Sequence, residues 1–539
     1  MVTSRENTIN PGTSNWTRSL RMTLNLGALL ANSAGKHPHT IALIENSRQF
    51  RYAEVDLLAR RVAGAFHELN VGNGDHVALL SPNCSAFTIS YYGILYAGAS
   101  VVSLNTLQSA DELTFQLTNS EAITLIVHGD CQATGLIAFS RVPTCKHLIL
   151  IDFGDCTTAN SGAISFEQLV TGAAEAEVFP TMPDDTAVIQ YTSGTTGIPK
   201  GAELSHFNLY YNAQYISERG FSLWPDRINI LGPGHVGLAA LPLYHTFGQT
   251  NIQNGMLFGG GAITYLKRFS SAEAMQVIAR DRVTFFPAVP TMYFALLHDE
   301  ANSKANLSSL QFCVSGGAPI PIEVKRQFET RFNVAIQEGY GLTETSPLAA
   351  MQKLDETNKA GTIGKPIDGV EFRIVDDQGH VLPDGERGEL LIRGPNVMKG
   401  YFKQPQATAE VLTNGWFHSG DIASIDSEGD ISIVDRKKDM ILRGGYNVYP
   451  REIEEVLYTH PAIKEAAVIG VADDRYGEEV KAIVSLKADR HAAPDELVDY
   501  CKQYVAAYKY PRIIEIRDEL PKGPTGKLLK RALREPDDH

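Results

Sequence analysis

Residues 186 to 206 read Thr-Ala-Val-Ile-Gln-Tyr-Thr-Ser-Gly-Thr-Thr-Gly-Ile-Pro-Lys-Gly-Ala-Glu-Leu-Ser-His, and the rest of the chain is organised around them. The apolar run from Ala187 to Tyr191 predicts a buried strand, which leads into a loop of glycines and hydroxyl residues. Glycines let backbone N–H groups turn toward an anion, while hydroxyls and a lysine add donors and a positive charge. We therefore interpret the loop as a phosphate cradle. Its predicted donors lie on Thr192, Ser193, Gly194, Thr195, Thr196, Gly197, Lys200 and Gly201.

The order of residues in this loop separates it from another common phosphate-binding loop. A Walker loop ends in Gly-Lys-Ser/Thr and runs into a helix, whereas this loop ends in Pro-Lys-Gly. The string from Tyr191 to Gly201 instead resembles the phosphate-binding motif of the adenylate-forming superfamily. Acyl-CoA synthetases, adenylation domains of peptide synthetases and firefly luciferase are members of that superfamily. The resemblance implies an enzyme that uses ATP with Mg²⁺ and, among the acyl-CoA synthetases, coenzyme A.

Length and composition restrict the function classes. A chain of 539 residues needs more than one hydrophobic core, and a net charge of −14 argues against nucleic-acid binding. The partners that the resemblance implies are a small carboxylic acid, ATP and coenzyme A. The six cysteines show no Cys-x-x-Cys spacing, which indicates reduced thiols. We find no signal peptide and no span of about 20 predominantly apolar residues, and we expect a cytoplasmic protein without an integral membrane segment. The sequence leaves the oligomeric state open, a homodimer included.

The order of the predicted elements indicates the fold of the first part of the chain. A hairpin from Ile41 to Tyr52 precedes an amphipathic helix from Glu54 to Leu69. Strands and helices then alternate, and a second α/β stretch runs from Thr186 to about Ala350. Such alternation predicts parallel sheets covered by helices. The alternating elements are expected at His76–Leu80, Ala86–Tyr96, Ser100–Leu104, Ala110–Leu117 and Ala122–Val127.

The pattern changes after Gly361. Short strands at Val370–Val375 and Glu389–Arg393 predict a small β-rich subdomain, and the last hundred residues predict a separate unit that begins with a hairpin from Ile431 to Leu442. The expected fold class is therefore α/β, with a large N-terminal domain of two parallel-type α/β subdomains plus the β-rich subdomain, and a small mobile α+β C-terminal domain. We place the N-terminal adenylation domain at residues 1–436 and the C-terminal domain at residues 437–539.

Two glycine-rich segments resemble the nucleotide-binding motifs of the superfamily, Ser315-Gly-Gly-Ala-Pro319 and Gln337-Glu-Gly-Tyr-Gly-Leu-Thr-Glu344. Paired glycines let a flat base approach the backbone, Tyr340 offers a ring for stacking, and Glu344 is a hard oxygen ligand suited to Mg²⁺. By resemblance, Thr343 contacts the α-phosphate, and Thr196 and Glu344 hold the metal. The residues expected around the adenine are Gly316, Gly317, Ala318, Pro319, Gly339, Tyr340 and Gly341.

Two later segments, Trp416–Asp421 and Asp435–Pro450, extend the resemblance to the ribose and to the domain junction. A carboxylate at the end of a tight turn can accept hydrogen bonds from both ribose hydroxyls. A hinge residue absorbs the backbone change between two domain orientations. A glycine pair after the hinge would let the pantetheine arm of coenzyme A pass. The residues that the resemblance assigns here are Asp421, Ile433 and Arg436 for the nucleotide, Lys438 for the hinge, and Gly444 and Gly445 for coenzyme A.

Lys527 is the predicted catalytic lysine. It lies in Leu520-Pro-Lys-Gly-Pro-Thr-Gly-Lys-Leu-Leu-Lys530, a glycine-bounded loop that resembles the C-terminal motif of the superfamily. Such a loop can bring a point charge to the reacting carboxylate and the α-phosphate. The implied chemistry has two steps, adenylation of an acid and thioester formation, separated by a swing of the C-terminal domain. A local positive patch for phosphates is expected from Lys522, Lys530, Arg531 and Arg534.

The acid substrate is predicted from the segment around His245. Leu241 to Gly248 resembles the superfamily segment whose histidine borders the acyl pocket, and Gln249 to Gly261 carries no charge, which disfavours amino acids. Glycines in that stretch are expected to leave volume beside an apolar wall from Phe285 to Pro290. We therefore predict a medium- or long-chain fatty acid. The glycines in question are Gly255, Gly259, Gly260 and Gly261, and the predicted catalytic set is Lys527, Glu344, His245 and Thr343.

Three alternatives stay open on the sequence alone. An aryl acid such as a cinnamate would also tolerate these walls. A fatty acyl-AMP ligase that loads a carrier protein would share the adenylation motifs, although no obvious insertion lies between Gly361 and Lys438. A nucleotide-binding protein without catalysis would have no need of Lys527, Glu344 and Asp421 together.

Overall fold

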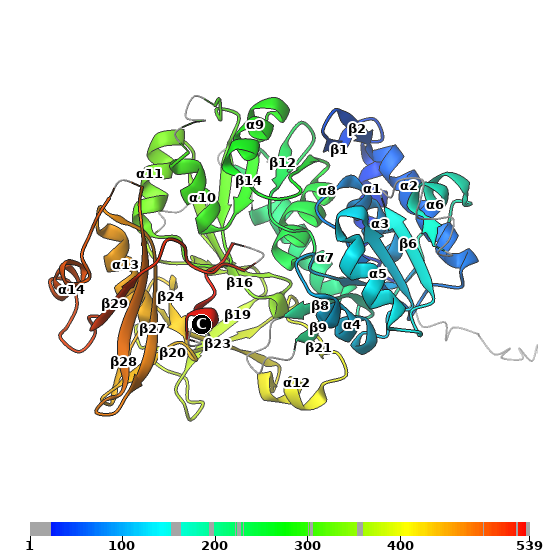
Figure 1. The fold of residues 1–539 in the computed structure, drawn as a ribbon. Helices are drawn as coiled ribbons and strands as arrows, with labels where there is room; N and C mark the ends of the chain where they lie inside the picture. The colour runs from blue at the N-terminus through cyan, green and yellow to red at the C-terminus, as the bar shows by residue number, and fades with distance from the viewer. Residues whose placement is uncertain are drawn as a thin grey trace, which may run out of the picture.

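The computed structural model describes residues 23–151, 163–192, 199–220, 222–223, 228–229, 231–299, 301, 305–352, 359–488, 490–523 and 526–534. These residues form two large sheets, a β-rich sheet and a C-terminal sheet (Figure 1). A two-stranded ribbon consists of β10 (Ser222–Leu223) and β11 (Ile228–Asn229). No helix in the described part of the chain is both long and apolar enough to cross a membrane.

The first large sheet has eight strands in the order β21-β9-β8-β4-β3-β5-β6-β7. Neighbours from β8 to β7 are parallel, and β9 turns back antiparallel to β8. Its strands are β3 (His76–Leu80), β4 (Ser100–Ser103), β5 (Thr124–His128), β6 (His147–Ile151), β7 (Ile164–Ser165), β8 (Thr186–Thr192), β9 (Lys200–Ser205) and β21 (Gly400–Tyr401). The helices of this part are α2 (Tyr52–Glu68), α3 (Ser85–Tyr96), α4 (Ala110–Asn119), α5 (Gln132–Ser140) and α6 (Phe166–Gly172).

The second large sheet has nine strands in the order β18-β17-β16-β15-β14-β12-β13-β1-β2. Six neighbouring strands of this sheet, β16, β15, β14, β12, β13 and β1, are parallel. Antiparallel strands close both edges, β2 beside β1 and β17 with β18 beside β16. They are β1 (Ile41–Glu45), β2 (Arg48–Arg51), β12 (Val236–Ala239), β13 (Ala262–Tyr265), β14 (Phe285–Ala288), β15 (Phe312–Ser315), β16 (Ile336–Gly341), β17 (Leu348–Met351) and β18 (Lys365–Pro366). The helices here are α1 (Ala28–Lys36), α7 (His206–Tyr215), α8 (Gly255–Gly259), α9 (Ser271–Asp281), α10 (Pro290–Leu297) and α11 (Ile322–Phe332), with a π-helical stretch at Phe247–Asn254.

Helix α3 lies in a core that the two large sheets share. Its residues are apolar on nearly every side, which suits a helix that is buried all round. Tyr92 of α3, Val101 of β4 and Phe285 of β14 belong to one continuous apolar cluster and are fully buried. The two sheets are therefore held together by a common interior, with the first sheet on the right of Figure 1 and the second at its centre.

The β-rich sheet and the C-terminal sheet correct one predicted element. The expected hairpin from Ile431 to Leu442 is wrong, because its two halves belong to different sheets. Strand β24 (Ile431–Arg436) pairs with β23 (Trp416–Ile425), whereas β25 (Ile441–Arg443) pairs with β26 (Tyr446–Val448) and β28 (Gly477–Leu486). The charged residues between them form the passage from one sheet to the other. The other elements of these parts are β19 (Glu371–Val375), β20 (Gly388–Arg393), β22 (Leu412–Thr413), α12 (Pro405–Val411), α13 (Pro450–Thr459), β27 (Ile463–Asp473), α14 (Pro494–Lys502), β29 (Ile513–Ile516) and α15 (Lys530–Arg534).

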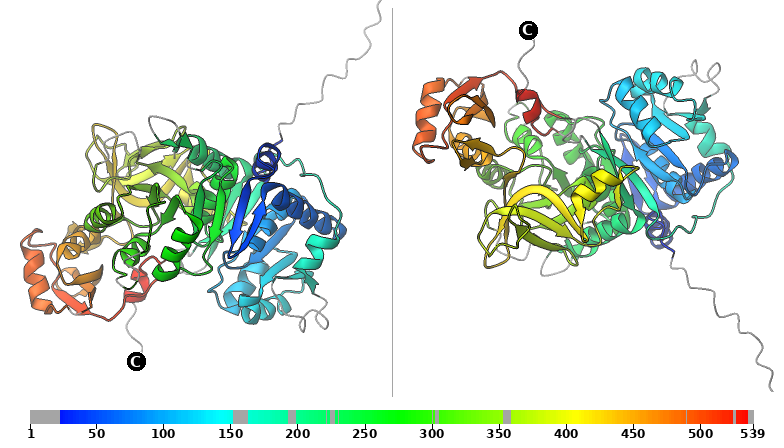
Figure 2. Two further views of the ribbon diagram at one scale, coloured as in Figure 1. Left: turned by 90° about the horizontal axis from the view of Figure 1, so that it is seen from above. Right: turned by 90° about the horizontal axis from the view of Figure 1, so that it is seen from below.

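The predicted fold class is confirmed. The chain forms two mostly parallel sheets with helices, a β-rich sheet and a small mixed sheet, with β1 and β2 joining the second large sheet and β21 joining the first. The C-terminal sheet has apolar clusters of its own, and in both views of Figure 2 it lies at the opposite end of the molecule from the helices of the first sheet.

Helix α8 packs against the chain that precedes β12 with almost no space between them. A Cβ added at Gly259 would lie 2.4 Å from the Leu231 carbonyl oxygen, and one added at Gly261 would lie 2.5 Å from the same atom. At Gly255 the nearest atom would be 3.2 Å away. The expectation that these glycines leave volume for an acyl chain is therefore wrong, because neighbouring atoms already fill the space: the Leu231 backbone at Gly259 and Gly261, and side chains at Gly255 and Gly260.

Replacing Gly259 by alanine should destabilise the protein by about 1–3 kcal/mol, since the backbone at Leu231 must move. The matched control is Gly35→Ala on α1, where an added Cβ meets nothing within 4 Å and the change should stabilise by up to about 1 kcal/mol. Urea and thermal unfolding of the two variants measure the difference. Equal stability of Gly259→Ala and the unchanged protein would contradict the close packing.

Candidate active site

The carboxyl ends of parallel strands in the second sheet lie at one edge, where most of the predicted site residues follow. Ala288, Ser315 and Glu338 sit side by side on β14, β15 and β16. The loops after these strands, and the loop after β12, carry the motif residues. Ligands of open α/β sheets bind at this edge. The β-rich sheet and the C-terminal loop approach the same edge (Figure 1).

A buried carboxylate, a guanidinium and a phenol form the centre of the site. Asp421 is 3% exposed and accepts a hydrogen bond from the Tyr340 hydroxyl at 2.5 Å. Arg436 Nε lies 2.7 Å from the other carboxylate oxygen. The pairing of β23 with β24 sets Asp421 opposite Arg436, so the backbone register brings these two charges together. The Asp421 carboxylate raises the pKa of Arg436.

Lys527 comes from the far end of the chain to the same place. The preceding Gly526 has φ +81°, and its carbonyl accepts a hydrogen bond of 3.1 Å from the Thr291 hydroxyl at the start of α10. The Lys527 side chain is accessible to solvent, but protein surrounds it on enough sides to desolvate its ammonium. The resulting desolvation lowers the pKa of the ammonium to about 8. Arg436 and Lys438 lower the pKa further, while Asp421 and Asp439 oppose them.

His245 lies near enough to Lys527 for the lysine charge to act on it. Burial lowers the pKa of His245 to about 4, and the positive charge of Lys527 adds to the shift. Its Nδ1 accepts a hydrogen bond of 3.3 Å from the Phe247 N–H, which leaves the ring proton on Nε2. The imidazole is therefore neutral near pH 7 and offers an N–H donor.

Glu344 and Thr343 lie on a single 3₁₀ turn, Thr343–Thr345, just after β16. The Glu344 Oε1 accepts a hydrogen bond of 2.9 Å from the hydroxyl of Tyr401, a residue that the sequence reasoning missed. Residue types and spacing carry no signal for this contact, because it depends on β21 pairing with β9. Among the described residues, no three His, Cys, Asp or Glu side chains gather to hold a metal.

The phosphate cradle is described only at its two ends. Thr192 ends β8, Lys200 begins β9, and the two residues are paired in register. The Lys200 ammonium lies 5.1 Å from the centroid of the Tyr401 ring. Ser193, Gly194, Thr195 and Thr196 lie outside the described residues.

The glycines expected around the adenine sit at positions of close approach. A Cβ on Gly316 would lie 3.0 Å from the Phe247 ring, and one on Gly341 would lie 1.6 Å from the Pro347 carbonyl oxygen. Gly317 has φ +77°, which favours glycine. Gly339 lies with Tyr340 on β16, whereas Ala318 and Pro319 follow Gly317 in the loop after β15. The two motifs thus border the edge that also holds Asp421.

Some predicted residues are not brought to this centre. Gly444 and Gly445 are exposed at the β25–β26 hairpin, and the Gly444 N–H donates to the Tyr476 carbonyl within the C-terminal sheet. Lys438 is exposed at the margin of the centre, near enough to act on Lys527, and partial desolvation and the charge of Arg436 lower its pKa. The Ile433 carbonyl on β24 accepts a hydrogen bond from Arg451.

The expected positive patch around Lys527 is reduced by ion pairs. Lys522 pairs with Glu465 at 2.7 Å, Lys530 with Glu454 at 2.8 Å and Arg534 with Asp439 at 3.0 Å. These carboxylates neutralise most of the added charge, so the patch was overestimated from the sequence.

Comparison with known proteins now decides the family. The sequence matches the AMP-binding enzyme family over residues 30–402 and the AMP-binding enzyme C-terminal domain over residues 452–527. The chain belongs to the AMP-binding enzymes. It is an adenylate-forming acid–CoA ligase, and enzymes of this kind use ATP, Mg²⁺ and coenzyme A.

Several relatives of this AMP-binding enzyme are similar over nearly their whole length. A long-chain-fatty-acid–CoA ligase of Bacillus subtilis (strain 168) is 35% identical over 536 residues, which cover 95% of this chain and 94% of the relative. A feruloyl-CoA synthase of Amycolatopsis sp is 34% identical, with 94% of this chain and 98% of the relative covered. The crystal structure of the anthranilate CoA ligase AuaEII in complex with anthranoyl-AMP has a TM-score of 0.88 at 28% identity and covers 95% and 97% of the two chains.

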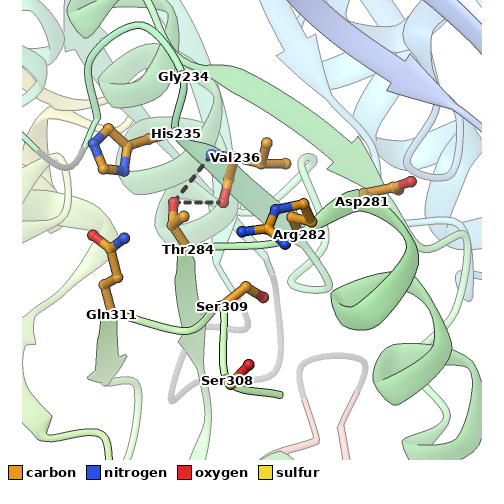
Figure 3. Close-up of a pocket in the computed structure, with 9 residues that line it drawn as sticks. All are labelled: Gly234, His235, Val236, Asp281, Arg282, Thr284, Ser308, Ser309 and Gln311. Carbon is orange, nitrogen blue, oxygen red and sulfur yellow. Dashed lines mark hydrogen bonds between the residues drawn. The ribbon is translucent and has the colours of Figure 1, made fainter. Parts of the chain in front are cut away.

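A hollow of about 370 Å³ in the AMP-binding enzyme is separate from this site (Figure 3). It lies where β12, β14 and β15 begin, which is the opposite edge of the sheet. The Thr284 hydroxyl there bridges the N–H and the carbonyl of Val236 at 3.1 and 3.2 Å. The hollow is lined by Gly234, His235, Val236, Asp281, Arg282, Thr284, Ser308, Ser309 and Gln311.

Only part of the predicted apolar wall, Phe285 to Pro290, is in a position to line an acid pocket. Phe285 and Phe286 are fully buried, and they pack against Phe312 and Tyr293 in the core. They therefore stabilise the sheet and do not line an open pocket. Val289, beyond the end of β14, lies close to Gly317 and Gly526.

Adenylation by the AMP-binding enzyme should lose efficiency as the pH rises through about 8. Lys527 is charged below its pKa of about 8 and loses its proton above it, so the attraction for the α-phosphate that its predicted role requires should disappear on the alkaline side. The profile of kcat/KM for ATP in pyrophosphate exchange without coenzyme A reports this free-enzyme pKa. Lys527→Arg should remove the alkaline fall even if its rate is lower, because arginine stays charged. A fall of the same shape in that variant would contradict the assignment.

Proposed function

We propose that the enzyme activates a medium- or long-chain fatty acid to its acyl-adenylate and then transfers the acyl group to coenzyme A. The observation that carries the adenylation step is the meeting of Lys527 with His245 and with the Asp421–Arg436 ion pair. These residues come from distant parts of the chain, and an ion pair with a buried carboxylate next to a cation of lowered pKa is typical of a functional site.

The first step needs positioning and charge more than a reacting side chain. A carboxylate is a poor acyl donor because oxide or hydroxide would have to leave. An acyl-adenylate is a good acyl donor because AMP leaves instead. We assign Asp421 and Arg436 to the ribose, Lys200 and the cradle to the outer phosphates, and Lys527 with Thr343 to the α-phosphate, where negative charge accumulates. We assign the Nε2–H of His245 to donate to the acid.

Glu344 fits a magnesium site shared with the substrate. Its carboxylate has a single described hydrogen bond, from Tyr401, and no ion-pair partner among the described residues. Mg²⁺ is usually bound by one or two carboxylates together with substrate phosphates, and when bound it neutralises phosphate charge. Glu344 would hold it, together with Thr196 of the cradle.

The second step is proposed to use another orientation of the C-terminal domain. We place the domain division after Arg436, where β24 ends, and the hinge at Lys438. In this structure Lys527 is at the site, while Gly444 and Gly445 are exposed on the C-terminal sheet. The position of Lys527 supports its role in adenylation, and we propose that a swing about the hinge brings Gly444 and Gly445 in for thioester formation.

The acid is assigned from the relatives and from the charge of the neighbouring chain. The similarity to the long-chain-fatty-acid–CoA ligase of B. subtilis, at 35% identity, supports a fatty acid. The π-helical stretch Phe247–Asn254 next to His245 is uncharged and largely buried, so no described charge there would pair with an ionised side group. An aryl acid is the second candidate, favoured by the likeness to the anthranilate ligase and the feruloyl-CoA synthase.

The described cysteines support a reducing compartment such as the cytoplasm. Cys84, Cys131, Cys145, Cys313 and Cys501 are all buried, and none of these five described cysteines forms a disulfide. A disulfide-stabilised secreted protein would use cysteines differently.

Pyrophosphate release over a panel of acids, with and without coenzyme A, tests the proposed function. The panel should include saturated fatty acids of increasing length, cinnamate, ferulate, benzoate and anthranilate. We expect the highest kcat/KM for a medium- or long-chain fatty acid and discharge of the adenylate by coenzyme A. Preference for the aryl acids would replace the fatty acid, accumulation of acyl-AMP with coenzyme A present would indicate a carrier-loading ligase, and no release with any acid would exclude catalysis.

Lys527→Ala should slow acyl-adenylate formation by at least about 10²-fold, because one preorganised charge at the developing anion is lost. Thioester formation from supplied acyl-AMP should stay within about threefold, since Lys527 serves the first step only. Lys522→Ala is the matched control, because Lys522 lies in the same loop and is paired with Glu465. Equal loss of both half-reactions in Lys527→Ala would contradict the division of roles.

A further inference from the structure

Tyr401 contacts two charged groups of the proposed site at once. Its hydroxyl donates a hydrogen bond of 2.9 Å to Glu344 Oε1, across 57 positions of the chain. The Lys200 ammonium lies 5.1 Å from the centroid of its ring, a distance at which a cation is attracted to an aromatic face. The residue is 9% exposed, so both contacts are largely shielded from water.

The backbone holds Tyr401 firmly in this position. Strand β21 pairs antiparallel with β9, with Tyr401 opposite Ala202. The Phe402 N–H donates to the Gly201 carbonyl at 2.7 Å, and the Tyr401 N–H donates to the Thr408 hydroxyl at 2.9 Å. The ring therefore stands directly beside the end of the phosphate cradle.

The Glu344 backbone is tied to the segment that carries Tyr401. The Met398 N–H donates to the Glu344 carbonyl at 2.9 Å, three residues before Tyr401. In the described part of the chain, Tyr401 is the one side chain that donates a hydrogen bond to the Glu344 carboxylate. The direction of that carboxylate consequently depends on a single phenol.

We propose that Tyr401 is a positioning residue for the metal–nucleotide substrate, acting through Glu344 and Lys200. The inference rests on the proposed function, in which Glu344 holds Mg²⁺ and Lys200 binds the outer phosphates. The hydroxyl fixes the carboxylate in the direction of the metal, and the ring face holds the lysine at the end of the cradle. Partners of this kind typically change metal affinity or activity 10–100-fold when removed.

Two substitutions separate the two contacts. Tyr401→Phe removes the hydroxyl and keeps the ring, whereas Tyr401→Leu removes both. Tyr96→Phe is the matched control, because Tyr96 donates its hydroxyl to the Asp56 carboxylate at 2.6 Å, on helices outside the site. Thermal unfolding of all three reports any loss of structure.

Binding is measured without an acid, using Mn²⁺ as a paramagnetic substitute for Mg²⁺ with ATP, and using ATP alone. We expect Tyr401→Phe to weaken Mn²⁺ binding to the ATP complex about tenfold and to leave metal-free ATP binding unchanged. Tyr401→Leu should in addition weaken metal-free ATP binding, because Lys200 loses the ring. The Mg²⁺ concentration for half-maximal pyrophosphate exchange should rise in parallel, and Tyr96→Phe should change neither quantity.

Unchanged Mn²⁺ binding in Tyr401→Phe would overturn the inference, and so would an equal loss in Tyr96→Phe. The binding measurement needs no acid substrate. If every acid fails to release pyrophosphate while Tyr401→Phe still weakens the metal complex, the proposed function fails and the role of Tyr401 stands.

Discussion

The ion pair between Asp421 and Arg436 is the interaction on which the site depends. The Asp421 carboxylate is almost fully withdrawn from water while the Arg436 guanidinium stays partly exposed, and burying a carboxylate is costly unless geometry and hydrogen bonds compensate. The register of β23 and β24 supplies the geometry, and the Tyr340 hydroxyl supplies a further hydrogen bond to the carboxylate. Arg436 is also the last residue of β24. The ion pair therefore anchors the end of the β-rich sheet, from which the chain continues to the C-terminal sheet.

The electrostatics around this pair explain how an acidic protein can receive a triphosphate. The chain carries a net charge of −14, and several cations near Lys527 are neutralised by carboxylates of the C-terminal part. Lys527 has no ion-pair partner among the described residues, and repulsion by Arg436, itself paired with Asp421, contributes to the lowered pKa of the lysine. A local field of this kind can attract an anion against the field of the whole molecule.

Periodicity and turn chemistry predicted most of the local structure. The strand His76–Leu80 was predicted with the observed bounds, and the hairpin that begins at Ile41 was also found, because both depend on neighbouring residues. The hairpin from Ile431 to Leu442 was wrong, since its halves pair with strands that are distant in the sequence. The volume assigned to Gly259 and Gly261 was also wrong, because composition does not reveal that the Leu231 backbone occupies that space.

The site itself could be predicted only in part. Residue chemistry suggested phosphate binding at the cradle, but the meeting of Lys527 with Asp421 followed from resemblance to a superfamily and not from any pattern in the chain. Tyr401 was missed because β21 has two residues and carries no periodic signal. Contacts between short strands and loops that are distant in the sequence cannot be predicted from local sequence patterns, and only the folded structure shows them.

The way in which the Lys527 loop is attached to the N-terminal part affects how easily it can leave the site. Within its described part, the loop is tied to the N-terminal sheets by one neutral hydrogen bond, between the Thr291 hydroxyl and the Gly526 carbonyl. A bond of this type contributes about 1 kcal/mol, which corresponds to roughly a fivefold preference for the attached state. A contact of this strength can break without unfolding either side. Lys527 can therefore leave the proposed nucleotide site and return to it while the rest of the molecule stays folded.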